Sequence, residues 1–157
     1  MLILLDIDGV MVPAKPWSAP TNLEDGFPMF SLKSIHALNH ILSQRKADIL
    51  LSTSHRDRFS LDEWTQIFRK RGIEANIIGK LSTHHSEALQ SRASEIRDWY
   101  MDYTGEDDFI IIDDDKTLNS LSQYLKARVV QTNPMVGLNA SHVIKAVELL
   151  DTPVERV

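Results

Sequence analysis

The chain has 157 residues, of which 43% are apolar, enough for the core of one domain but not for two. Its formal net charge of -5 gives no sign of general attraction to nucleic acid or to an acidic membrane. The lack of cysteine excludes disulfides, thiolate metal sites and a cysteine nucleophile. The apolar run Met1–Leu5 is too short for a signal peptide or a membrane span, so we expect a soluble, cytoplasmic protein without a membrane contact.

The first predicted element is a buried strand that ends in two acids. Met1–Leu5 is typical of a parallel strand, and Asp6 and Asp8 follow it directly. In open α/β sheets ligands bind beyond the carboxyl ends of the strands, so both carboxylates are expected to reach such a site. Gly9 then lets the backbone turn tightly around a bound group. A proline-rich loop at about residues 11–30 is expected to form a flap over this site.

Helical and extended patterns alternate along the rest of the chain. Apolar residues at three- and four-residue spacing predict helices at about 31–42, 60–71, 91–101, 118–125 and 141–150. Short apolar runs predict strands at 47–51, 75–78, 109–112 and 128–131. Such alternation indicates parallel βαβ units with right-handed crossovers. The predicted fold is therefore one three-layer α/β domain over residues 1–157, with a mainly parallel five-stranded sheet.

A second acid cluster follows the strand expected at 109–112. If that strand lies beside the first, Asp113, Asp114 and Asp115 join Asp6 and Asp8 at one site. Their repulsion is tolerated only if a hard cation such as Mg²⁺ neutralises it, or if some of the acids stay protonated.

Hydroxyl and basic side chains complete the set of candidate site residues. The strand at 47–51 ends in hydroxyls, and basic residues stand after the next strand and at the start of the following helix. The full set of hydroxyl, histidine and basic candidates is Ser52, Thr53, Ser54, His55, Arg56, Lys80 and Arg92. By contrast, the adjacent His84 and His85 lie in a polar connection and are expected to be solvated rather than to bind a metal.

In this order, the motifs resemble those of the haloacid dehalogenase (HAD) superfamily of phosphohydrolases, over nearly the whole chain. The resemblance is closest to the HAD domain of Swiss Army Knife RNA repair proteins. It is carried by Leu51–Arg56, Arg92 with Glu95, Ile96 and Trp99, Ile112–Asp114, and Gly137-Leu138. The architecture that we expect is a HAD-like Rossmannoid fold with strand order 5-4-1-2-3 and no large cap domain.

The resemblance implies roles for the acids. Asp6 would attack phosphorus and form an aspartyl-phosphate. Asp8 would protonate the leaving oxygen and then take a proton from the attacking water. Asp113 and Asp114 would hold Mg²⁺ together with the Asp6 carboxylate and the Asp8 backbone carbonyl. Asp115 would orient a metal-bound water or simply be exposed.

The resemblance also implies a set of phosphate contacts. Thr53 would donate a hydrogen bond to the phosphate, with Ser52 as the alternative if the strand is shifted by one residue. Arg92 would supply the cation, and Lys80 is its rival. The further candidates for phosphate or substrate binding are Gly9, Ser54 and Arg56.

These observations predict a Mg²⁺-dependent phosphatase whose substrate is a phosphorylated nucleic-acid end or a nucleotide. A site without a cap admits a polymer end, which Arg56, Arg58 and Trp17 are placed to contact. The alternatives are a phosphatase of a small phosphometabolite enclosed by the flap, a receiver-like signalling domain, or an inactive domain that binds a phosphorylated partner. The sequence points to no particular protein partner.

Overall fold

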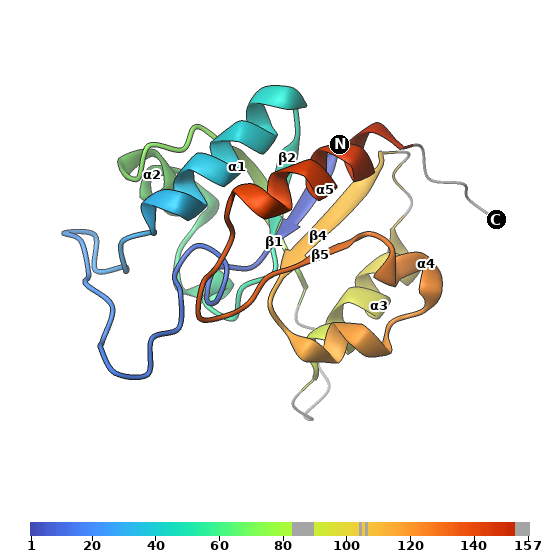
Figure 1. Ribbon diagram of the computed structural model, residues 1–157, viewed down its shortest axis with the longest axis horizontal. Helices are drawn as coiled ribbons and strands as arrows, with labels where there is room; N and C mark the ends of the chain where they lie inside the picture. The colour runs from blue at the N-terminus through green and yellow to red at the C-terminus, as the bar shows by residue number, and fades with distance from the viewer. Residues whose placement is uncertain (83–89, 104, 106, 153–157) are drawn as a thin grey trace.

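The described residues form a parallel sheet between two layers of helices (Figure 1). The computed structural model of the protein describes residues 1–82, 90–103, 105 and 107–152. The strands are β1 (Leu2–Leu5), β2 (Asp48–Leu51), β3 (Asn76–Lys80), β4 (Phe109–Asp113) and β5 (Val129–Gln131). The helices are α1 (Leu32–Gln44), α2 (Leu61–Lys70), α3 (Arg92–Asp102), α4 (Gln123–Lys126) and α5 (Ala140–Asp151), with 3-10 helices η1 (Arg56–Arg58) and η2 (Lys116–Ser120).

The strand order is β3-β2-β1-β4-β5, and each neighbouring pair is parallel. This result confirms the predicted α/β fold and the order 5-4-1-2-3. Neither the segment between β1 and α1 nor the short connection between β3 and α3 is long enough for a large cap domain. Within the described part of the chain, no helix combines the length and apolar character needed to cross a membrane.

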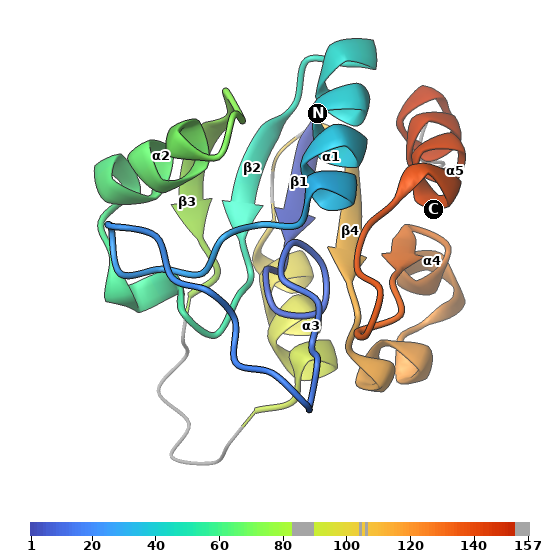
Figure 2. The same ribbon diagram turned by 60° about the vertical axis from the view of Figure 1, so that its left-hand side comes forward.

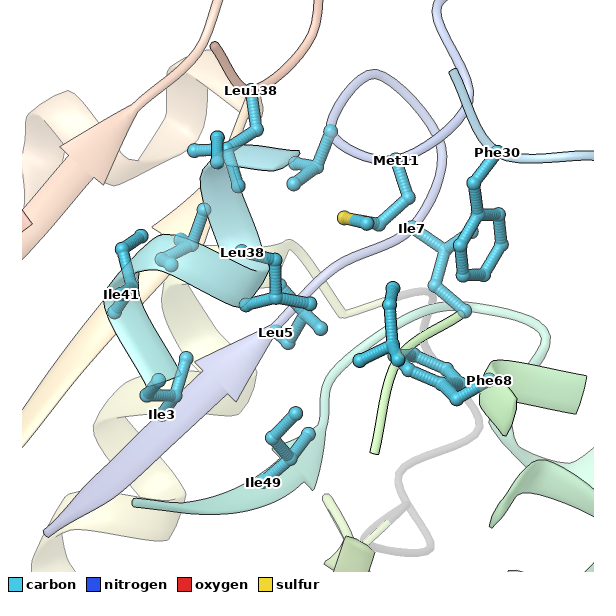
Figure 3. Close-up of a cluster of buried hydrophobic side chains, with 14 of the residues drawn as sticks. Ile3, Leu5, Ile7, Met11, Phe30, Leu38, Ile41, Ile49, Phe68 and Leu138 are labelled. Atoms are coloured by element: carbon cyan, nitrogen blue, oxygen red, sulfur yellow. The ribbon is translucent and has the colours of Figure 1, made fainter. Parts of the chain in front are cut away.

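Both faces of the sheet are covered, which explains the uninterrupted apolar run of β1 (Figure 2). Ile3 and Leu5 point into a core shared with α1, α2 and α5. Leu2 and Leu4 point into a second core shared with α3, η2 and α4. Figure 3 shows the first core, in which side chains of the sheet pack against α1, α2 and the loops beside them. By strand alternation, the residue after Leu5 faces the α3 side of the sheet.

Side-chain caps set the starts of the helices that matter for the site. Ser60 and Glu63 form the predicted capping box at the start of α2. Ser91 accepts a hydrogen bond from the backbone N–H of Ser94 and so caps α3. Arg92 is therefore the first residue of α3, at the helix end that faces the carboxyl edge of the sheet.

The structure differs from the sequence prediction around residues 118–125. One helix was expected there, but η2 and α4 are separate, with Leu121 extended and Ser122 capping the second helix through the N–H of Leu125. Leu118, Leu121 and Leu125 are all buried in the same core. The apolar residues at helical spacing therefore come from two short helices instead of one, because Ser122 caps a new helix between them.

Strand β3 is longer than predicted and reaches Lys80. The register of its pairing with β2 shifts so that Ile49 pairs with Ile77 and Leu50 with Gly79. Ile78 is thus left out of the pairing and is half exposed. An extra residue of this kind is a β-bulge, which apolar alternation cannot reveal.

The loop after β1 is fixed at both ends, whereas Trp17 near its middle is 71% exposed. At its start, the backbone carbonyl of Val10 accepts hydrogen bonds from the Leu138 N–H and the Ser34 hydroxyl. Gly137 adopts a positive φ of 79°, and a Cβ there would lie 2.7 Å from that same carbonyl. Gly137-Leu138, part of the family signature, therefore holds the turn that follows the acid pair.

Arg71 clamps the other end of the loop to α2. Its guanidinium, 1% exposed, pairs with both carboxylate oxygens of Asp25 and donates to the carbonyls of Phe27 and Pro28. It also lies against the rings of Phe27 and Phe30. The hydrogen bond from Arg71 lowers the pKa of Asp25 below its usual value.

We predict that Arg71→Met lowers the free energy of unfolding by about 3 kcal/mol, because it leaves the partly buried Asp25 charge and the carbonyls of Phe27 and Pro28 without their donor. Arg69→Met, which removes an exposed pair with Glu74, is the matched control and should cost less than about 1 kcal/mol. Since the Asp25 pKa is lowered in the folded state, the contribution of the pair is present at neutral pH and is lost as the pH falls through that pKa. Urea unfolding at neutral and acid pH measures both effects. Equal losses in the two variants would contradict the clamp.

Candidate active site

Three carboxylates converge at the carboxyl edge of the sheet. Asp6 follows β1, and Asp113 is the last residue of the neighbouring strand β4. The Asp6 N–H donates to the carbonyl of Ile112, so Asp6 and Asp113 lie side by side at the ends of their strands. Asp6, Asp113 and Asp114 each offer an oxygen, and these oxygens lie within 4.8 Å of one another.

Burial makes this cluster electrostatically costly. Asp6 is 5% exposed and Asp113 is fully buried. Burial, together with the nearby Asp113, raises the pKa of Asp6 to about 9, against the opposing effect of Arg92. Burial raises the pKa of Asp113 to about 6. Without a cation, the protein therefore holds at least one of these carboxyls protonated at neutral pH.

Arg92 enters the cluster from the start of α3. Its Nη2 lies 3.7 Å from Asp6 Oδ1, and its Nε lies 3.4 Å from Asp113 Oδ2. The side chain is 10% exposed. The structure thus brings Arg92 to the acids, as the sequence predicted.

The cluster contains polar atoms whose hydrogen-bonding capacity is unused. Among the described residues, the buried side-chain atoms without a hydrogen-bond partner are Ser52 Oγ, Arg92 Nε, Arg92 Nη1 and Asp113 Oδ2. The Ser52 N–H donates to the carbonyl of Leu5, so Ser52 lies beside Asp6 at the same edge. Buried donors and acceptors without partners are rare, because each costs roughly 1–3 kcal/mol. These donors fit an anion, and Asp113 Oδ2, whose one contact of this kind is the 3.4 Å ion pair with Arg92 Nε, fits a hard cation.

Gly9 permits the close approach of Asp114. It adopts a φ of 76°, and a Cβ at this position would lie 2.1 Å from a carboxylate oxygen of Asp114. The Gly9 carbonyl accepts a hydrogen bond from the buried Thr132 hydroxyl, 2.8 Å away. Asp114 after β4 and Thr132 after β5 therefore both contact the turn that follows β1, and these contacts hold it in place.

Asp8 differs from the other acids. Its side chain is 56% exposed, and its Oδ2 accepts a hydrogen bond of 2.8 Å from His55 Nε2. The Asp8 carboxylate is not in the acid cluster found among the described residues. Its carboxylate therefore lies outside the cluster and is open to solvent.

Two of the candidate phosphate-binding side chains, Lys80 and Arg56, are bound by other groups of the protein. Lys80 lies on the edge strand β3, two strands away from β1, and its Nζ donates to the carbonyl of Phe59 at 2.6 Å. Arg56 is 4% exposed, and its guanidinium donates to three backbone carbonyls and pairs with Glu95. Arg56 therefore fastens the end of β2 to α3 and has no face open to a substrate.

The hydroxyls after β2 take different positions. Thr53 is buried, and its Oγ1 accepts a hydrogen bond from the backbone N–H of His55. Ser54 is exposed. Asp115 caps η2 by accepting from the N–H and hydroxyl of Thr117, so it is held within its own turn. The pair of histidines at 84 and 85 lies outside the described residues.

The sequence analysis missed the contacts that His55 and Thr132 make. The sequence places His55 beside the phosphate site, within reach of a substrate, but does not predict its contact with Asp8, and Thr132 is not among the candidate site residues. Thr132 directly follows β5, so a polar residue after a strand was the signal available for it. No local pattern could show that His55 would reach Asp8, since these residues lie on different strand ends.

A parallel α/β sheet with a buried acid cluster and an arginine at its carboxyl edge fits a domain of the HAD superfamily. Residues 2–143 match the model of one family within that class, and the chain belongs to it: the HAD domain in Swiss Army Knife RNA repair proteins. Comparison with curated proteins found no significant match, and comparison with solved structures found none either.

We predict that Asp6→Asn stabilises the metal-free protein at alkaline pH. Between the unfolded pKa of 3.8 and the folded pKa of about 9, the folded state holds a proton that the unfolded state has lost, so stability falls as the pH rises. Asparagine cannot ionise, so the variant should exceed the wild type by about 1–3 kcal/mol near pH 8 and by less near pH 5.

Urea unfolding in EDTA measures this difference, with Asp57→Asn, an exposed acid, as the control. Saturating Mg²⁺ should then stabilise the wild type more than Asp6→Asn. A variant that is less stable than the wild type near pH 8 in EDTA would contradict the electrostatic account.

Proposed function

We propose that the protein is a Mg²⁺-dependent phosphatase that acts through an aspartyl-phosphate on Asp6. The observation that supports this proposal best is the set of buried atoms without partners, from Ser52, Arg92 and Asp113. They combine unused donors for a phosphate with an unused carboxylate oxygen for a cation. Such a combination serves phosphoryl transfer, in which catalysis depends on positioning and on neutralising charge.

The acids divide the reaction into two displacements. An oxygen of Asp6 bonds to phosphorus while the bond from phosphorus to the ester oxygen breaks, and Asp8 donates its proton to that departing oxygen. Asp8 then removes a proton from water. The resulting hydroxide attacks phosphorus, which releases inorganic phosphate and restores the Asp6 carboxylate.

Ser52 and Arg92 are the proposed phosphate ligands. The Ser52 hydroxyl has no partner, whereas the Thr53 oxygen already takes part in the turn that follows β2. Because the Thr53 oxygen only accepts there and keeps its own hydrogen, Thr53, the residue first expected from the sequence, stays the alternative donor to Ser52. Arg92 Nε and Nη1 supply two further donors next to the nucleophile.

Asp6, Asp113 and Asp114 would hold Mg²⁺, together with the Asp8 backbone carbonyl. Their oxygen ligands and their spacing fit a hard divalent cation. When bound, the cation offsets the negative charge of the phosphate and of the carboxylates around it. The raised pKa of Asp6 is consistent with this need, because Asp6 must be ionised to act as a nucleophile.

We predict that the wild type hydrolyses a phosphate monoester only with Mg²⁺, and that Asp6→Asn reduces turnover to background. The substitution keeps the shape of the side chain but removes the nucleophilic oxygen pair. The assay follows phosphate release with and without EDTA, after chromatography that excludes contaminating phosphatase. Lys80→Ala is the control and should retain activity, because its amine is bound to the Phe59 carbonyl. Turnover by Asp6→Asn equal to that of the wild type would refute the proposed mechanism.

The proposed substrate is a phosphorylated nucleic-acid end or a nucleotide. The family description refers to RNA repair proteins, which supports this substrate class. The absence of a large inserted cap leaves room for a polymer beside Asp8. Arg58 and Trp17 are both exposed and can contact a backbone phosphate or stack on a base, whereas Arg56 cannot.

We predict that kcat/KM is higher for a 3′-phosphorylated oligonucleotide than for its mononucleotide, and lowest for small sugar phosphates. Contacts beyond the phosphate should also make the oligonucleotide advantage fall as salt rises. The three substrates are compared at fixed salt and then over a salt series. A preference for sugar phosphates would favour the alternative, a phosphatase of small phosphometabolites, and leave the phosphatase proposal intact.

A further inference from the structure

The exposed acid of the site has a specific partner. Asp8 Oδ2 lies 2.8 Å from His55 Nε2, and the two residues come from the ends of β1 and β2. An exposed carboxylate ordinarily rotates between solvent-separated positions. The hydrogen bond to His55 restricts Asp8 to one orientation.

A second contact indicates which nitrogen of His55 carries the proton. His55 Nδ1 lies 3.4 Å from Arg58 Nη1. Arginine can only donate, so Nδ1 accepts and Nε2 carries the hydrogen. The His55 Nε2–H then donates to Asp8, which leaves Asp8 Oδ1 free to carry a proton of its own.

The imidazole is itself held in place by the clamped loop. The edge-to-face contact between Phe27 and His55 has a centroid distance of 5.6 Å. Phe27 is 1% exposed, packs against Trp64, and is fixed through its backbone carbonyl by Arg71. The backbone N–H of His55 donates to the Thr53 hydroxyl oxygen, which fixes the main chain at this residue, while Arg58 donates to the ring. The ring is thus fixed by packing and by hydrogen bonds that are independent of Asp8.

We propose that His55 is a positioning residue that orients the carboxyl of Asp8 for proton transfer to the leaving group. This inference rests on the proposed phosphatase function. During the first displacement, the proton moves from Asp8 Oδ1 to the departing oxygen as the bond from that oxygen to phosphorus breaks. His55 keeps its own proton and holds Oδ2 throughout. Arg58 and Phe27 set the tautomer and the plane of the ring.

The test compares esters that differ in their need for an acid. The p-nitrophenolate of p-nitrophenyl phosphate departs without protonation, whereas the alkoxide of an alkyl phosphate needs it. The ratio kcat/KM is the proper measure, because it reports the steps up to departure of the leaving group. The variants are His55→Phe, which keeps a ring, His55→Gln, which keeps an N–H donor, and His40→Phe as an exposed control on α1.

We predict that His55→Phe lowers kcat/KM for the alkyl phosphate by about 10²-fold and changes that for p-nitrophenyl phosphate by less than about 3-fold. His55→Gln should recover a large part of the loss, because its side-chain amide can donate to Asp8. His40→Phe should match the wild type on both esters.

An equal fall on both esters would overturn the role of His55, since it would indicate a defect in folding or in phosphate binding. Unchanged kinetics in His55→Phe, or a loss in His55→Gln as large as that in His55→Phe, would overturn it as well. Failure of the wild type to hydrolyse either ester with Mg²⁺ would instead refute the proposed function, and this inference with it.

Discussion

The repulsion between buried carboxylates at the ends of β1 and β4 is the constraint on which the rest of the structure depends. Asp6 and Asp113 are adjacent because their strands pair directly, and burial raises the pKa of both. Arg92 offsets only part of this cost, and it keeps donors of its own without partners. In the proposed function, a cation and a phosphate would satisfy the groups that Arg92 leaves unpaired, and phosphoryl transfer requires both.

The surrounding fold holds this strained edge in place. Gly9 makes room for Asp114, while Gly137 allows the last loop to approach the carbonyl of Val10. At the far end of the loop, Arg71 fixes the segment that packs on His55. The loop described as a flap in the sequence analysis is therefore anchored at both ends, and only its middle portion, near Trp17, is exposed.

The parts of the fold that depend on local patterns were predictable from the sequence. Continuous apolar runs identified the strands, and Ser60 with Glu63 identified the start of α2. The acid pairs after β1 and β4 were predictable for the same reason, because strand ends of a parallel sheet share an edge. The split of the helix after β4 and the bulge at Ile78 were not, since the first depends on the Ser122 cap and the second on the register between β2 and β3, and apolar spacing reveals neither.

Long basic side chains were the least predictable part of the site. Sequence position placed Lys80, Arg56 and Arg92 near the phosphate equally well. Tertiary contacts distinguish them, because backbone carbonyls bind Lys80 and Arg56, whereas Arg92 keeps donors without partners. Sequence position likewise did not separate Ser52 from Thr53; in the structure the Thr53 oxygen accepts from the backbone N–H of His55, whereas the Ser52 hydroxyl has no partner.

The most direct test of the account is to trap the covalent intermediate. The wild type with Mg²⁺ and a phosphate monoester is quenched in acid during turnover, and its peptides are analysed by mass spectrometry. The account predicts a phosphoryl group on the peptide that contains Asp6, sensitive to hydroxylamine as an acyl phosphate is, and absent from Asp6→Asn. A phosphoryl group on another side chain, or rapid turnover without any phosphorylated peptide, would contradict it.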